Sequence, residues 1–264
     1  MKDKKLFDAL KKVVKTAKKG FTDATGGALH RLNDTKPSID TVKELVQGIP
    51  EAMSVMNDED RLAIQSMLEQ GAGIKYIPIL AKEGNKHNVG GTGMRGGLLV
   101  SDPVNDDGNL LECLASMHDD EDSITIDTDC IDAMKKLKKA DLFLKEDIEE
   151  YGLLYDSCNP RSKMRFEYLA QWDPDSLIID DYGHFPFSHF MINEFDDLNR
   201  FTMCLQTTIK HHPQDLGVLF RKDRRGDTAY ERALEKHGKE ATFKVIQECI
   251  PTNTSLPILH HAMK

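Results

Sequence analysis

The sequence predicts an all-α protein, an α-solenoid of stacked helix-turn-helix repeats. A degenerate motif returns about six times along the 264 residues, and each copy opens with a turn and closes with an apolar helix. The apolar anchor residues of these copies lie 33 to 47 residues apart, a spacing that is typical of two-helix repeats. The anchors are Leu29, Ile64, Leu111, Leu154, Phe187 and Ala229.

The repeats are expected to begin near residues 26, 61, 107, 152, 183 and 226, with a partial repeat from residue 256. The widest gap, 47 residues between the second and third anchors, predicts long insertions in the middle repeats. We therefore expect one array over residues 21–264, preceded by a separate helix over residues 1–20. Because one helix cannot bury its apolar stripe alone, at least about three stacked repeats are needed for stability.

The last complete repeat shows the local physics most clearly. Thr228 can cap a helix by accepting a hydrogen bond from a free backbone N–H, and Gly226 permits the positive φ of a tight turn. Closing helices carry apolar side chains at i, i+3, i+4 and i+7. Two such stripes are Val42, Leu45, Val46 and Ile49, and Phe201, Cys204, Leu205 and Thr208.

The repeat openings resemble those of ankyrin repeats. The segments Gly226-Asp227-Thr228-Ala229, with Ala233, and Gly183-His184-Phe185-Pro186-Phe187 are similar to the glycine and Thr-Pro-Leu-His turn of that family. In the third and fourth copies the Thr, Pro and His positions are mostly replaced, so a HEAT-like or tetratricopeptide-like array stays open as an alternative. The resemblance implies a non-catalytic scaffold or adaptor that binds another protein through its concave face and turn tips.

The turn tips supply the candidate partner contacts, and catalytic, cofactor and metal sites are not expected. Acidic tips in the middle of the array favour a protein partner with a basic patch. The candidate contact residues are Asp58, Glu59, Asp107, Tyr182, His184, Arg224 and Arg225.

Composition excludes several other classes of protein. A net charge of -9 disfavours nucleic-acid binding, which needs a basic surface to displace phosphate counterions. Five scattered cysteines are typical of reduced thiols in an intracellular protein. The sequence shows neither a membrane-spanning apolar run nor the apolar core of a signal peptide. We therefore expect a monomer that resides in the cytoplasm or nucleus.

Residues 1–20 form a basic amphipathic segment, with eight lysines against Asp3 and Asp8. Its apolar side chains fall on one helical face, which predicts an N-terminal cap over the first repeat. Attachment of this helix to anionic lipid is an alternative, and it would make the protein a membrane-recruited adaptor.

A glycine-rich segment offers a competing hypothesis. Gly91-Thr92-Gly93-Met94-Arg95-Gly96 matches the G-x-G-x-x-G pattern of nucleotide-binding loops, and Lys82, Lys86 and Arg95 could contact phosphates. The flanking sequence does not predict the strand and helix that such a loop requires, so a flexible insertion is expected at residues 90–97. A nucleotide-binding protein or enzyme that uses this loop stays an alternative.

Metal binding is not expected at the histidine pairs or at the acidic run of residues 119–122. The histidines lack Cys-x-x-Cys or His-x-x-x-His spacing. The acidic run lacks the glycine and the closing glutamate of an EF-hand loop. A solvated acidic connector is the expected structure there.

Overall fold

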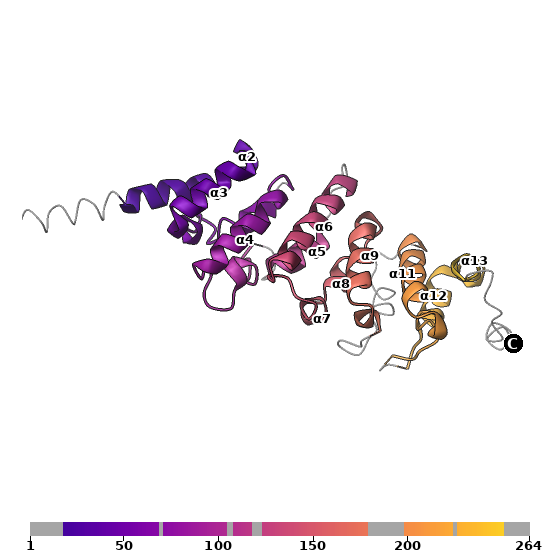
Figure 1. Ribbon diagram of the computed structural model, residues 1–264. Coiled ribbons are helices and arrows are strands. Elements are labelled where there is room, and N and C mark those ends of the chain that lie inside the picture. The colour runs from indigo at the N-terminus through magenta and orange to yellow at the C-terminus, as the bar shows by residue number, and fades with distance from the viewer. Residues whose placement is uncertain are drawn as a thin grey trace, which may run out of the picture. The chain divides into compact units, whose positions relative to one another are not determined.

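The fold is helical throughout the described part of the chain. The computed structural model describes residues 18–68, 71–104, 108–117, 123–178, 198–223 and 226–250. Within these ranges all regular secondary structure is helical, apart from the isolated antiparallel bridges Met56–Leu62 and Lys222–Thr228. This confirms the predicted all-α class (Figure 1). None of the helices in these ranges is long and apolar enough to cross a membrane.

The chain divides into two compact units, Met1–Leu144 and Lys145–Lys264. In the first unit, residues 18–30 form a helix. The elements that follow are α2 (Leu32–Thr35), α3 (Ile39–Gly48), η1 (Pro50–Ser54), η2 (Gln65–Leu68), η3 (Ile74–Tyr76), α4 (Ile77–Lys86), η4 (Arg95–Gly97), α5 (Leu110–Ser116) and α6 (Ser123–Lys139).

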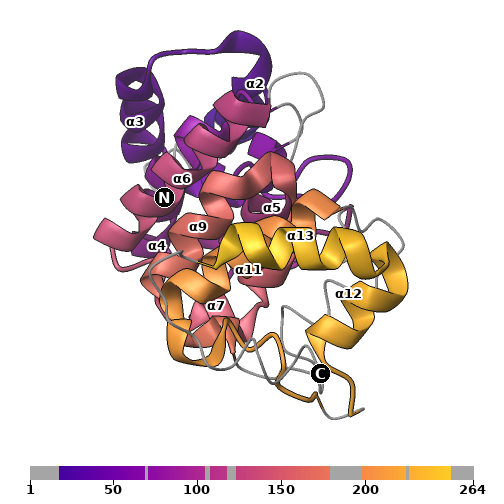
Figure 2. The ribbon, with the colours of Figure 1, turned by 90° about the vertical axis from the view of Figure 1, so that its right-hand side faces the viewer.

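The second unit has the same mixture of short and longer helices. Its elements are α7 (Asp147–Glu150), α8 (Leu153–Asp156), η5 (Pro160–Ser162), α9 (Lys163–Trp172), η6 (Asp175–Leu177), α11 (Leu198–His211), η7 (Pro213–Asp215), α12 (Ala229–His237) and α13 (Lys239–Cys249). Figure 2 shows α12 and α13 as a pair, and Gly238 is the single residue between them in the chain.

The longer helices bury their apolar stripes against their neighbours. In the first unit α3 packs on α4 and α4 packs on α6; in the second, α9 packs on α11 and α11 on α13. The predicted stripe Phe201, Cys204, Leu205 and Thr208 on α11 is fully buried. On α3, Val42 and Val46 are buried and Leu45 is partly exposed, as is Ile49, the residue that follows the helix. Helical spacing of apolar residues therefore identified the core faces of these two helices.

Each unit has, among its described residues, a connector of three consecutive residues with positive φ. Arg95, Gly96 and Gly97 have φ of 46°, 72° and 96°, and Leu216, Gly217 and Val218 have φ of 47°, 62° and 59°. In both connectors the last residue accepts a hydrogen bond from the backbone N–H three residues further on. Val100 donates to Gly97 O at 3.3 Å, and Arg221 donates to Val218 O at 3.0 Å. The two segments therefore have the positive φ values and this hydrogen bond in common.

The same order of parts continues after each connector. A turn closes when the Asp102 N–H donates to Gly108 O and the Asp223 N–H donates to Asp227 O, each at 2.9 Å. The next residue is then the N-cap of a helix, Asn109 for α5 and Thr228 for α12. Both caps are complete capping boxes, closed by Glu112 and by Glu231.

Three sequence expectations are wrong in detail. Gly26–His30, expected to form the turn that opens the first repeat, lies inside the helix 18–30. This helix also continues past residue 20, the expected end of the N-terminal segment, and residues 1–17 lie outside the described part. Residues 90–97 are not a loose insertion, because Gly96 and Gly97 are buried and Gly96 lies against α4.

Replacing Gly96 by alanine is expected to destabilise the protein. A Cβ there would lie 2.2 Å from the Ala81 carbonyl oxygen, and the residue has φ +72°. Left-handed strain and overpacking together predict a loss of about 2–4 kcal/mol in the free energy of unfolding. Gly93→Ala is the matched control, since Gly93 has φ +84° and an added Cβ meets no atom within 4 Å. Denaturant titrations that give equal losses for the two variants would contradict the packing argument.

The capping box of α12 predicts a pH-dependent contribution to stability. Hydrogen bonds from the Thr228 hydroxyl and backbone hold the pKa of Glu231 below its ordinary value of 4.5. Because the folded-state pKa is lowered, the stabilisation is present above pH 4.5 and is lost as the pH falls below that value. Glu231→Gln should therefore lower the melting temperature near pH 7, and this difference should shrink toward pH 3. Glu235→Gln, outside the capping box on the same helix, should show a smaller pH-dependent difference.

Candidate protein-contact surface

Two of the seven candidate contact residues lie in the described part of the chain. Asp58 and Glu59 are exposed on the turn between η1 and η2. The rest, Asp107, Tyr182, His184, Arg224 and Arg225, lie outside the described residues. The geometry of the candidate surface is therefore that of the turn at residues 56–62, here named the first tip.

Backbone and side-chain hydrogen bonds close the first tip. The Asn57 N–H donates to Arg61 O at 3.1 Å, and the Asp60 N–H donates to Asn57 O at 3.1 Å. The Asn57 side-chain oxygen accepts from the N–H groups of Glu59 at 3.1 Å and Arg61 at 2.9 Å. Asp60 takes the left-handed conformation, with φ 59°. Asp58 and Glu59 are thus held outward at the apex of a fixed turn.

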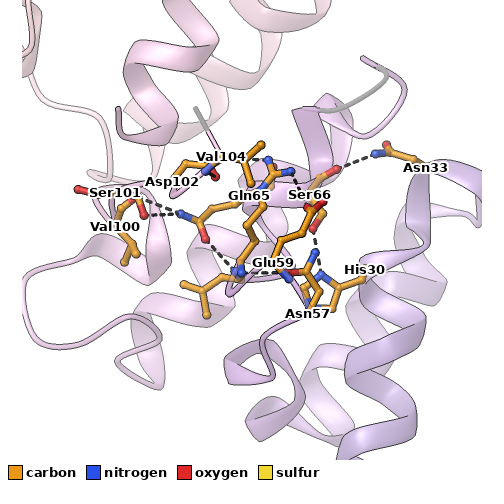
Figure 3. A network of polar contacts seen from close by, with 12 residues as sticks. His30, Asn33, Asn57, Glu59, Gln65, Ser66, Val100, Ser101, Asp102 and Val104 are labelled. Carbon is orange, nitrogen blue, oxygen red and sulfur yellow. Dashed lines mark hydrogen bonds and ion pairs between the residues drawn. The ribbon is translucent and has the colours of Figure 1, made fainter. Parts of the chain in front are cut away.

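A buried ion pair joins the first tip to Asp102, which is labelled in Figure 3. Arg61 Nη2 lies 2.8 Å from Asp102 Oδ2, and the two side chains are 3% and 1% exposed. The same nitrogen donates to Gln65 O at 2.8 Å, and Arg61 Nη1 lies 3.8 Å from the Glu59 carboxylate. Arg61 therefore connects the exposed acidic apex to the interior.

Gln65 ties the first tip to residues 100–104, which begin the next turn. Its side-chain oxygen accepts from the Leu62 N–H at 2.7 Å, and its amide nitrogen donates to Val100 O at 3.2 Å and Ser101 O at 3.0 Å. The Asp102 carboxylate also accepts from the Val104 N–H at 3.1 Å. Figure 3 shows these contacts as one network that fixes two successive turns relative to each other.

The network reaches the helix 18–30 through His30 and Ser66. His30 Nδ1 lies 3.0 Å from Ser66 Oγ, and His30 Nε2 lies 2.9 Å from Val55 O. Asn33 of α2 donates to Ser66 O at 2.7 Å. Serine beside histidine resembles a nucleophile beside its base, but Ser66 is only 2% exposed, so a substrate cannot reach its hydroxyl. The pair joins structural elements.

Three N–H groups of the glycine loop make hydrogen bonds within the loop or to its start. The N–H groups of Gly91, Met94 and Gly97 donate to carbonyls of the same loop and its start, Asn88, Gly91 and Met94. A phosphate-binding loop needs such groups free to face the ligand. Lys86, one of the expected phosphate contacts, lies 2.8 Å from the Glu83 carboxylate. Close packing on α4 accounts for Gly96 without a ligand.

The buried residues Arg61, Gln65 and Asp102 were not among the sequence candidates. The signal for them was weak: a charged and an amide side chain flank the apolar segment Leu62–Ile64. Within the described ranges, groups of three or more His, Cys, Asp and Glu that could hold a metal ion do not occur.

No family model, curated protein or solved structure matches this chain. Function is therefore inferred from geometry and charge. The arrangement at the first tip lacks an accessible nucleophile paired with a base, and it presents acidic side chains on a fixed backbone. Chemically, it can recognise a cationic surface.

Removing one partner of the buried pair should be strongly destabilising. Arg61→Ala leaves the Asp102 carboxylate buried beside a cavity, and a loss of about 3–5 kcal/mol in the free energy of unfolding is expected. The double variant Arg61→Ala with Asp102→Ala should lose less than the sum of the two single losses.

Lys18→Ala is the control, because the Lys18–Glu51 pair is 67% and 51% exposed and should contribute little. Urea titrations of all four variants measure the effect. An Arg61→Ala loss no larger than that of Lys18→Ala would show that the ion pair does not hold the tips.

Proposed function

We propose that this chain is a non-catalytic, ankyrin-like interaction array that binds a protein partner carrying a basic patch. The observation that carries the proposal is the first tip, where Asp58 and Glu59 are exposed on a backbone fixed by Asn57, Arg61 and Gln65. The repeated order of connector, turn, capped helix and second helix supports the array.

A fixed tip favours binding because little conformational entropy is lost when a partner docks. Turn residues that move freely would lose that entropy on binding, which reduces affinity. The buried ion pair and the Gln65 hydrogen bonds fix the tip before any partner arrives. Presentation of side chains on short turns above a packed helical scaffold is the arrangement expected of repeat proteins that bind other proteins.

The charge of the first unit determines the kind of partner. Asp58, Glu59 and Asp60 are consecutive and exposed, and residues 101–144 of the same unit contain 12 Asp and Glu against 4 Lys and Arg. Exposed acidic groups accelerate association with a cationic surface and make it sensitive to salt. Met56 and Val104, 55% and 52% exposed, add apolar contact area beside the two turns. A lysine- or arginine-bearing face with apolar residues nearby fits this surface.

The test is affinity capture from a native lysate with three baits: wild type, a tip variant with Asp58→Ala and Glu59→Ala, and a control variant with Asp129→Ala and Asp132→Ala. The control removes two exposed acids from α6 in the same unit and changes the net charge equally. We expect a protein that wild type and control retain, that the tip variant loses at least about tenfold, and whose retention falls as salt rises.

Circular dichroism and melting temperature should be the same for the three baits. Equal retention by the tip variant and wild type would exclude the first tip as the contact surface. Equal loss from both variants would show that general acidity, and not the tip, attracts the partner.

A further inference from the structure

Two cysteines that are far apart in the sequence meet in the core of the second unit. The Sγ atoms of Cys158 and Cys204 lie 2.7 Å apart, although 46 residues separate them. Both are thiols, and they are 3% and 2% exposed. Cys158 follows α8 and precedes η5, and Cys204 lies within α11.

Packing on both sides fixes this approach. The Cys158 N–H donates to Tyr155 O at 3.0 Å, and the adjacent Ser157 carbonyl accepts from Ser162 Oγ at 2.9 Å. Cys204 lies in a continuous helix beside the buried Phe201 and Leu205, and α11 packs on η5 and α9. The two sulfur atoms are held together by the backbone of two packed segments, not by flexible side chains alone.

We propose that Cys158 and Cys204 form an oxidation site that closes a disulfide when the protein meets a peroxide. An S–S bond is about 2.05 Å long, so closing it requires a movement of about 0.7 Å. Such a movement lies within the rotamer adjustment of two cysteine side chains. The site is independent of the protein partner proposed above.

The chemistry proceeds in two balanced steps. One thiolate attacks an oxygen of hydrogen peroxide, the O–O bond breaks, and a sulfenic acid and one water form once the thiol proton is counted. The second thiol then attacks the sulfenic sulfur, the S–O bond breaks, the S–S bond forms, and a second water leaves. The cysteine pair loses two electrons and two protons, and the peroxide accepts them. A small neutral oxidant suits a buried pair because it can reach the sulfur atoms during local opening.

Cys249 provides an internal contrast. Burial, together with the neighbouring Glu248 charge, raises the pKa of its thiol to about 11. The contrast with the pair lies in geometry, because Cys158 and Cys204 are placed against each other whereas the sulfur of Cys249 faces a backbone carbonyl. That sulfur lies 4.0 Å from the Thr202 carbonyl oxygen.

Closing the bond would join the turn after α8 to α11, two segments assigned by sequence to successive repeats beginning near 152 and 183. Neighbouring repeats are normally held only by their packed interface. A covalent link between them restricts the unfolded chain, and the stabilisation grows with the length of the closed loop. Oxidation would therefore stiffen the second unit.

The experiment treats the full chain with a small excess of hydrogen peroxide at neutral pH, alkylates remaining thiols in denaturant, and maps the peptides by mass spectrometry. We expect one dominant linked peptide joining Cys158 to Cys204, reversible by dithiothreitol. The melting temperature should rise by about 10 °C on oxidation and return on reduction. Cys249→Ala should leave both results unchanged, and Cys204→Ala should abolish both.

Peptide mapping of wild type decides the question even where Cys204→Ala fails to fold. The proposal is overturned if the peptide linking Cys158 to Cys204 is absent from oxidised, folded wild type. It is also overturned if this peptide forms in no higher yield than peptides linked through Cys113, Cys130 or Cys249. A linked peptide without a rise in melting temperature would overturn the stiffening while leaving the oxidation site in place.

Discussion

The first unit depends on one buried ion pair, Arg61 with Asp102. The side chains of Arg61 and Asp102 are only 3% and 1% exposed. A charge buried to this extent is stable only when it is paired and hydrogen-bonded, because an unpaired buried charge loses its solvation by water without compensation. The need to pair these two charges holds the segment of Arg61 and the segment of Asp102 together. Arg61 belongs to the first tip and Asp102 begins the next turn, so the pair sets the distance between two successive turns. The backbone that carries the exposed Asp58 and Glu59 is held in place by the same pair.

The second unit has the positive φ values and the turn hydrogen bond in common with the first, but different ionic contacts. Asp223 occupies the place of Asp102 at the start of its turn, but its partner is Arg232 of α12, at 2.9 Å, and Arg232 also lies 3.0 Å from Asp227. The acid is thus tied to the helix that follows it, whereas Asp102 is tied to the preceding tip. The turn geometry therefore does not require one particular ion pair. In both turns a cation reaches the acid from a neighbouring segment.

Sequence reasoning worked where the determinants are local. The spacing of Phe201, Cys204 and Leu205 identified a buried helical face, and Thr228 was identified as a helix cap that the structure shows as a capping box. It failed at Gly26 and Gly27, because glycine as a turn signal is weak when the surrounding residues can continue a helix. Pairs of residues far apart in the chain could not be predicted from the sequence. Arg61 and Asp102 are 41 positions apart, and Cys158 and Cys204 are 46 positions apart. Only the packing of the helices brings these partners together.

The two connectors show why glycine content alone is a poor guide to function here. At residues 95–97 two of three left-handed positions are glycine, yet at 216–218 the flanking positions are Leu216 and Val218. A left-handed L-residue costs about 1–2 kcal/mol. Both side chains are buried, at 3% and 2% exposure, and burial of such side chains contributes about 1.5–3 kcal/mol, which offsets the strain. Only the central glycine is sterically required, since an added Cβ at Gly96 or Gly217 would meet helix backbone. A glycine-rich match at the first connector therefore follows from the backbone path, without any need for a phosphate.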